Sequence, residues 1–174
     1  MIEDFKGFLS VYSDNWHDWG PQIYEAIWVT IQLTIASFSL AVVLGLLLAV
    51  GKLSNIGLVR GFCTAYIEIA RGVPALAVLF LLYFGLVPLG IVFDAFTAGA
   101  IGLGMSAAGY IAEVFRAGIQ AIHKGQREAA LAVGMTPMMT FRHIILPQAI
   151  RIILPPMLNM VILLLKDTSI CSLI

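Results

Sequence analysis

The stretch from Ala26 to Gly51 reads AIWVTIQLTIASFSLAVVLGLLLAVG and carries no charged residue. A helix must supply about 20 apolar residues to cross a hydrocarbon core ~30 Å thick, because each residue rises about 1.5 Å. This stretch is long enough to do so. It predicts a transmembrane helix and indicates that the chain is a membrane protein.

The composition of the whole chain agrees with that prediction. Of 174 residues, 60% are hydrophobic and 11% are charged, and the mean hydropathy is +0.97. Soluble domains are about 45–50% apolar and about 25% charged. We therefore predict an all-α polytopic membrane protein. The two cysteines, Cys63 and Cys171, are too few for a disulfide framework or a metal site, and a net charge of zero argues against a nucleic-acid partner.

Three further stretches are candidates for membrane spans, giving four in all. Gly72 to Phe93 and Ala95 to Ala112 are free of charged residues. Ile152 to Leu165 is shorter and contains Pro155 and Pro156, so it needs residues from both flanks to reach across. Pro74 is suited to the first position of a helix, where its missing N–H costs nothing.

Lysine and arginine indicate the orientation. With the N-terminus outside, only Lys6 and Lys166 fall on the outer side, and the other eight basic residues fall inside, as the positive-inside rule predicts. Those eight are Lys52, Arg60, Arg71, Arg116, Lys124, Arg127, Arg142 and Arg151. The expected location is a bacterial plasma (inner) membrane, crossed several times.

Residues 1–21 are expected to form a short outer-side segment at the membrane interface. Tyr12, Trp16 and Trp19 suit an aromatic belt at that depth. The segment is acidic and lacks an apolar core, so it is not expected to be a signal peptide.

Small residues recur at every fourth position of the third span, at Ala100, Gly104, Ala108 and Ala112. Such a ridge lets another helix approach closely. It fits either a seam at a moving interface or ordinary helix packing.

The loop between the last two spans has the clearest local signals. Residues 125–137 read GQREAALAVGMTP, in which residues 128–133 favour helix. Gly134 can adopt the left-handed conformation that ends a helix. Thr136 suits an N-cap and Pro137 the first position of the next helix. We expect two short helices joined at a glycine, serving either as a docking element or as a plain connection.

The second of these short helices is expected to run through residues 141–145. Pro147 should end it, because proline removes a backbone donor from the helical ladder.

Five sequence blocks, in this order and spacing, resemble the permease subunits of ABC importers for polar amino acids. The blocks are Arg71-Gly-Val-Pro, YIAEVFRAGIQAI from Tyr110, GQREAALAVGMT from Gly125, RHIILPQA from Arg142 and Lys166-Asp-Thr-Ser. The resemblance covers the chain from about Trp19 to its end.

The resemblance implies a permease domain at residues 22–174 with a cytoplasmic coupling loop at about 121–146. In that family the loop helix inserts into the ATP-hydrolysing subunit. The signature residues carried over to this chain are Glu128, Ala129, Ala130 and Gly134. Family members usually add a fifth helix after the Lys-Asp-Thr-Ser block, whereas this sequence stops at Ile174, so we expect four spans without that last helix.

The resemblance also implies partners. These are ABC ATPase subunits that hold ATP and Mg²⁺, a second permease copy or a paralogue, an extracytoplasmic solute-binding protein, an amino-acid substrate and membrane lipid. No cofactor, no metal and no enzyme activity of its own are expected for this chain. Its nearest approach to a phosphate-binding loop, Gly51-Lys52, is followed by Leu53 where serine or threonine is required.

Three pairs of charged residues are candidates for contact with a zwitterionic substrate, because ionisable groups at membrane depth are costly. They are Glu68 with Arg71, Glu113 with Arg116, and Lys166 with Asp167. Each pair supplies one partner for an ammonium group and one for a carboxylate. Alternatively, the residues pair with each other, extend to an interface or fix helix ends.

Two other function classes remain open from the residues alone. An autonomous secondary carrier or channel would need coupling-ion residues in the membrane and no docking loop. A non-transporting membrane scaffold would need neither. Co-purification of an ATPase would distinguish an importer from an autonomous carrier or channel. Uptake of solute into vesicles would distinguish an importer from a scaffold.

Overall fold

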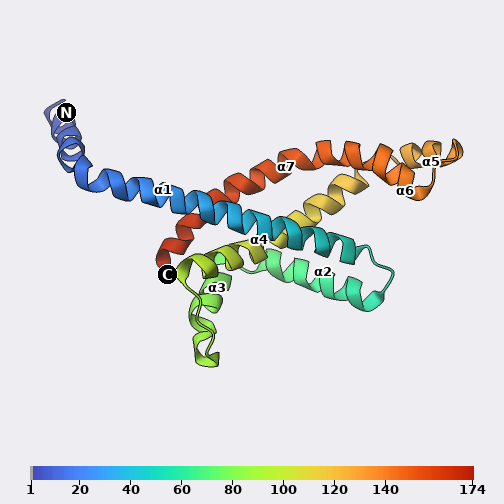
Figure 1. The fold of residues 1–174 in the computed structure, drawn as a ribbon, viewed down its shortest axis with the longest axis horizontal. Coiled ribbons are helices and arrows are strands. Elements are labelled where there is room, and N and C mark those ends of the chain that lie inside the picture. The colour runs from blue at the N-terminus through green and yellow to red at the C-terminus, as the bar shows by residue number, and fades with distance from the viewer. Residues whose placement is uncertain (1) are drawn as a thin grey trace. The chain divides into compact units, whose positions relative to one another are not determined.

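The computed structural model describes the backbone from residue 2 and the side chains of residues 11 and 15–174. Every regular element within those residues is helical, which confirms the predicted all-α class (Figure 1). The chain divides into two compact units, Met1–Gln32 and Leu33–Ile174. The second unit holds every residue discussed below as a site.

The first unit consists of the beginning of helix α1 (Ile2–Lys52). The expected short N-terminal segment is thus part of one long helix, which contains Pro21. Trp16 and Trp19 of the predicted aromatic belt are exposed. The side chain of Tyr12 lies outside the described residues.

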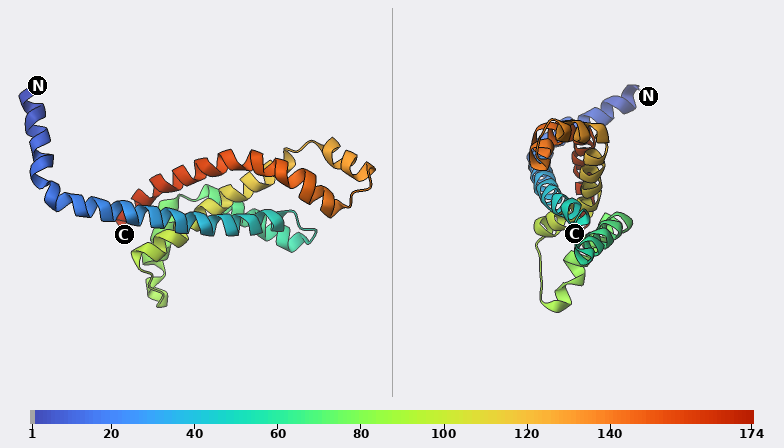
Figure 2. Two further views of the ribbon diagram at one scale, coloured as in Figure 1. Left: turned by 45° about the horizontal axis from the view of Figure 1, so that its top comes forward. Right: turned by 90° about the vertical axis from the view of Figure 1, so that its right-hand side faces the viewer.

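The second unit contains the rest of α1 and all later helices. These are α2 (Gly57–Gly72), α3 (Ala75–Phe80), the π-helical turn η1 (Leu81–Gly85), the 3₁₀ turn η2 (Val87–Leu89), α4 (Ala95–Gln120), α5 (Lys124–Ala132), α6 (Pro137–Thr140), the π-helical turn η3 (Phe141–Ile145), α7 (Leu146–Asp167) and the 3₁₀ turn η4 (Thr168–Leu173). Helix α4 is central, since it contacts α2, α3 and α7 (Figures 1 and 2).

Two clusters of buried side chains hold α4 in place. On one side, Leu103 and Ile111 of α4 pack with Leu164 of α7 and with the second half of α1. On another side, Ala108 of α4 packs in a cluster with Ile67 of α2. Close van der Waals packing in these two clusters holds α4 against its neighbours, since burial of apolar surface from lipid supplies no hydrophobic driving force.

Small residues on α4 allow these close approaches. A Cβ added at Gly104 would lie 2.8 Å from Leu40 Cδ2 of α1, and one added at Gly109 would lie 3.2 Å from the Ile67 carbonyl oxygen of α2. Gly104, Ala108 and Ala112 are buried. Close packing along the predicted ridge is therefore observed, while movement at that seam stays a prediction.

The second predicted span is corrected by the structure. Residues 72–93 do not form one helix, because the chain bends by 105° between α2 and the α3–η2 segment. Val73 is extended, with φ −94° and ψ 130°, and Pro74 precedes α3 instead of occupying its first position. A proline disfavours helical geometry in the preceding residue, so the break follows from the Val73-Pro74 sequence.

Among the residues that the structure describes, three helices are long and apolar enough to cross a membrane, or four if the bent α2–α3 pair counts as one span. The three cover Asn15–Lys52, Ala95–Gln120 and Pro137–Leu173. The last includes Pro155 and Pro156 within α7 and extends beyond both ends of the predicted core, as expected.

The prediction that Pro147 ends a helix is wrong. Residues 141–145 form a π-helical turn that passes directly into α7, and Pro147 lies in the first turn of α7. A proline is tolerated in the first turn, where its N–H would have no partner.

Asp94 caps the start of α4. Its carboxylate accepts bonds from the Thr97 hydroxyl at 2.7 Å and from the Thr97 backbone N–H at 3.0 Å. These bonds favour the ionised form and hold the pKa of Asp94 below its ordinary value. The cap gives α4 a defined start just before its first apolar residue.

Candidate functional site

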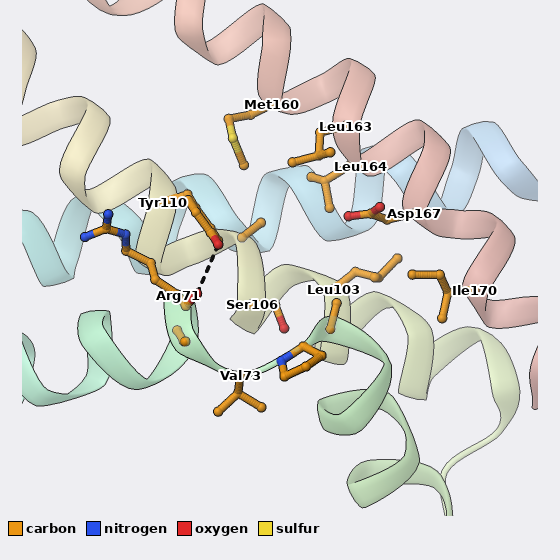
Figure 3. Close-up of a pocket in the computed structure, with 15 residues that line it drawn as sticks. Arg71, Val73, Leu103, Ser106, Tyr110, Met160, Leu163, Leu164, Asp167 and Ile170 are labelled. Carbon is orange, nitrogen blue, oxygen red and sulfur yellow. Dashed lines mark hydrogen bonds between the residues drawn. The ribbon is translucent and has the colours of Figure 1, made fainter.

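A cavity of about 400 Å³ lies between α2, α4 and α7 (Figure 3). The bend after α2 forms part of its wall through Val73 and Pro74, and α7 contributes Met160 and Leu163. Most of the wall is apolar. The polar groups that line it are few, which is the usual make-up of a site that orients a small solute.

The cavity contains one basic and one acidic residue, taken from two different predicted pairs. Arg71 comes from the end of α2 and Asp167 from the end of α7. Lys166 is exposed and does not line the cavity, and neither does Glu68. The bend at Val73-Pro74 explains why sequence spacing did not reveal this combination.

Arg71 is held mainly by Tyr110 of α4. The Tyr110 hydroxyl donates to the Arg71 carbonyl oxygen at 3.1 Å, and the guanidinium carbon lies 5.7 Å from the centre of the Tyr110 ring. The predicted partner Glu68 is only at the limit of ion pairing, 4.0 Å away, with both side chains solvent-accessible. An exposed pair of this kind contributes little.

Ser106 is a polar group of the cavity that sequence reasoning missed. Its side chain is 8% exposed, and its hydroxyl has no hydrogen-bond partner among the described residues. A buried hydroxyl without a partner is unfavourable, so a bound solute or water that used it would gain a bond. In the sequence Ser106 stands in a run of small residues, which gave no signal for it.

Glu113 and Arg116 pair with each other, and the structure adds a third member. Arg116 Nη2 and Lys52 Nζ each lie 2.6 Å from a different Glu113 oxygen. Arg116 also donates to the side-chain oxygen of Gln120 at 2.6 Å. Lys52 is the last residue of α1, so this cluster ties the end of α1 to α4. The long sequence separation hid the contribution of Lys52.

The loop after α4 forms a helical hairpin, residues 123–140, built largely by the predicted local signals. Helix α5 ends at Ala132 and is closed by Gly134, whose φ is +84°, with the Met135 N–H donating to the Ala130 carbonyl at 3.1 Å. This is the glycine-dependent helix end expected there. Thr136 then caps α6 by accepting a bond from the Met139 N–H. Helix α5 begins four residues earlier than predicted, after His123.

The hairpin presents a mixed surface. Of the signature residues, Glu128, Ala129 and Gly134 are exposed, whereas Ala130 is 6% exposed. Within the described part of the chain, the Glu128 side chain has no hydrogen-bond or ion-pair partner, so no anchoring partner for it is seen. The apolar side chains of Val133 and Met138 are more than two-thirds exposed, at 78% and 73%. Both side chains add exposed apolar surface to the hairpin.

Comparison with known proteins shows related membrane transport subunits. The family described as "Binding-protein-dependent transport system inner membrane component" matches residues 41–174. A probable amino-acid ABC transporter permease of Bacillus subtilis (strain 168) is 41% identical over 88% of this chain and 68% of its own length. A probable glutamine ABC transporter permease of the same organism is 37% identical over 95% of this chain and 75% of its own length.

Solved structures show the same fold. A chain of the crystal structure described as an amino acid ABC transporter with histidines has a TM-score of 0.87 and 40% identity, covering 95% of this chain and 75% of that one. A chain of the MetNI methionine ABC transporter in an inward-facing conformation has a TM-score of 0.64 and 27% identity, covering 82% and 69%. The predicted resemblance is thus confirmed: the chain is a membrane-integral protein that belongs to the family of binding-protein-dependent transport system inner membrane components.

Proposed function

We propose that this chain is the permease subunit of an ATP-driven importer that carries a polar amino acid into the cytoplasm. The observation that carries the proposal is the cavity in which Arg71 and Asp167 line one largely apolar wall. A zwitterionic amino acid needs a cation for its carboxylate and an anion for its ammonium group. Relatives named for glutamine, L-cystine and glutamate transport support this substrate class.

The energy comes from partner ATPase subunits that bind ATP and Mg²⁺, and this chain has no catalytic role. The hairpin is the docking element: Glu128 is unpaired, Ala129 is small and exposed, and Gly134 fixes the turn. Val133 and Met138 add exposed apolar surface that a groove in the ATPase would cover. A short rigid projection of this kind transmits motion without needing a flexible linker.

The path forms between two permease subunits, a second copy or a paralogue, and an extracytoplasmic binding protein delivers the solute. ATP binding favours an outward-open state, and hydrolysis with release restores the inward-open one. Both states are needed because a path open to both sides at once would leak.

The hairpin faces the cytoplasm and the N-terminus lies outside. Lys124, Arg127 and Arg142 lie in or beside the hairpin, which favours the inner side. Arg71 no longer counts toward this argument, because its contact with Tyr110 places it beside the middle of α4. The remaining basic residues still favour the same orientation.

Docking is tested by purifying the membrane complex and measuring its ATPase activity in lipid discs. The wild-type chain is expected to retain an ATPase. The double change Glu128→Arg and Gly134→Pro is expected to release the ATPase or uncouple its activity, since it reverses an exposed charge and forbids the positive φ of Gly134. Recovery of no ATPase with the wild-type chain would contradict the proposal and favour a carrier or a scaffold.

The substrate site is tested by comparing two neighbouring residues of α7. Asp167→Asn is expected to lower amino-acid uptake at least tenfold without loss of assembly, since a bond to a charged group is worth about 1.5–3 kcal/mol. Lys166→Gln is the matched control, because Lys166 is exposed and does not line the cavity. Normal amino-acid uptake by the Asp167→Asn variant would show that Asp167 is not part of the substrate site.

A further inference from the structure

A second cavity, of about 470 Å³, follows the first along the same face of α4 and α7. Its wall includes Glu113 and Ala117 of α4 and Ile152 and Pro156 of α7. The first cavity uses residues nearer the start of α4 and the end of α7, such as Ser106 and Asp167. The two cavities therefore lie in series, with the second one nearer the hairpin.

The two cavities share two lining residues, Arg71 and Tyr110. Along α4, Ser106 lies about one turn before Tyr110 and Ala117 about two turns after it, or roughly 6 Å and 10 Å along the axis. In the view of Figure 3 the Arg71 guanidinium lies on the side of Tyr110 away from Asp167. The pair Tyr110 and Arg71, which lies where the two cavities adjoin, is called the partition below.

The partition is held by few contacts. Tyr110 donates one hydrogen bond to the Arg71 carbonyl, and the guanidinium lies near its ring. Tyr110 is 42% exposed, and the Arg71 side chain is 41% exposed. A side chain with this much free surface can change rotamer at small cost, unlike the buried residues around it.

The charges suit the transfer of a zwitterion from one cavity to the next. Arg71 lines both cavities, and its guanidinium lies beyond Tyr110 from Asp167 (Figure 3), so it can follow a solute carboxylate from the first cavity to the second by changing rotamer. The acidic partner changes from Asp167 to Glu113. Glu113 is already bound by Lys52 and Arg116, and it therefore has less to offer an ammonium group than Asp167 does. The second cavity should hold the solute more weakly, which favours its release.

We infer that Tyr110 and Arg71 form a gate between a solute-holding cavity and a release cavity on the cytoplasmic side. The inference rests on the proposed import function. Rotation of the Tyr110 ring, with loss of its hydrogen bond to Arg71, opens the gate. The solute class that fits is a zwitterionic amino acid.

The gate is tested with a charged, membrane-impermeant thiol reagent applied to the cytoplasmic side of inside-out vesicles holding the complete complex. The background replaces Cys63 and Cys171 with alanine. Leu163→Cys reports on the first cavity and Ala117→Cys on the second. Ala117→Cys should react rapidly. Leu163→Cys should react slowly, and at least tenfold faster once Tyr110→Ala is added.

Two variants keep the test decisive. Tyr110→Phe keeps the ring but removes the hydrogen bond to the Arg71 carbonyl, so Leu163→Cys should react faster than in the parent and more slowly than with Tyr110→Ala. Arg71→Ala removes the other half of the partition and should speed labelling even if Tyr110→Ala fails to fold. Equal labelling of Leu163→Cys with and without these changes would overturn the gate.

ATP-driven uptake is measured in parallel with the cysteine-bearing complexes that keep Tyr110 and Arg71. If labelling follows the expected pattern but no amino acid enters the vesicles, the proposed import function is wrong, whereas the conclusion that Tyr110 and Arg71 separate the two cavities stands. If uptake is normal and the labelling pattern is missing, the gate alone is wrong.

Discussion

The hairpin at residues 123–140 and the cavity wall around Arg71 are built in different ways. In the hairpin, each turn is specified by a residue at the turn itself: Gly134 ends one helix and Thr136 begins the next. In the cavity, Arg71 and Asp167 are nearly a hundred positions apart in sequence, and they line one cavity only because α2 and α7 both pack against α4. The hairpin can therefore be predicted from residues close together in sequence, whereas the cavity cannot.

The difference follows from the range of the interactions. Caps and positive-φ glycines act within one turn of backbone, so they operate wherever the sequence places them. A cavity needs several helices held at fixed spacing, and that spacing depends on small residues such as Gly109. Changes in packing should therefore damage the cavity while leaving the hairpin intact.

The largest effect is expected from Gly109→Leu. The added side chain would collide with Ala70 and with the backbone of Ile67 and force α2 away from α4. Overpacking of this kind costs about 1–3 kcal/mol. The thermal midpoint of the purified chain should fall by several degrees. Gly61→Leu is the control, because a Cβ there meets nothing within 4 Å; equal midpoints for the two variants would contradict the packing role of Gly109.

An intermediate and local effect is expected from Gly134→Ala. At φ +84° the added Cβ costs about 1–2 kcal/mol, which should raise hydrogen exchange of the hairpin amides about five- to thirtyfold. Exchange in α4 should not change. Gly57→Ala serves as control, since Gly57 has open space and no positive φ. Faster exchange throughout the unit would show that the hairpin is not a local structure.

The smallest effect is expected from Asp94→Ala, and it should depend on pH. Because folding lowers the pKa of Asp94, the cap contributes fully above the unfolded pKa of about 4 and is lost as pH falls through the lower folded pKa. The variant should melt below the wild type at pH 7, and the difference should shrink toward pH 3. A difference independent of pH would show that the carboxylate charge is not what caps α4.

Sequence reasoning worked best where the deciding signal was local. The all-helical class, the hairpin with its glycine turn and Thr136 cap, and the close-packed ridge on α4 were all predicted. The error at Pro147 was also local: the chain uses a π-helical turn before it, so the proline falls in a first turn. The second span was misplaced because a charge-free stretch was read as one helix across Val73-Pro74, whose geometry breaks it.

The sequence by itself determined that this chain lies in a membrane, is helical and carries a hairpin, because apolar composition and turn chemistry act without reference to distant residues. Only the tertiary structure decided that Lys52 completes the Glu113–Arg116 cluster and that Tyr110 donates to the Arg71 carbonyl and places its ring near the Arg71 guanidinium. These contacts join residues on different helices. These contacts form only if the neighbouring helices approach α4 closely enough. The spacing of residues along one helix does not determine the distance between two helices.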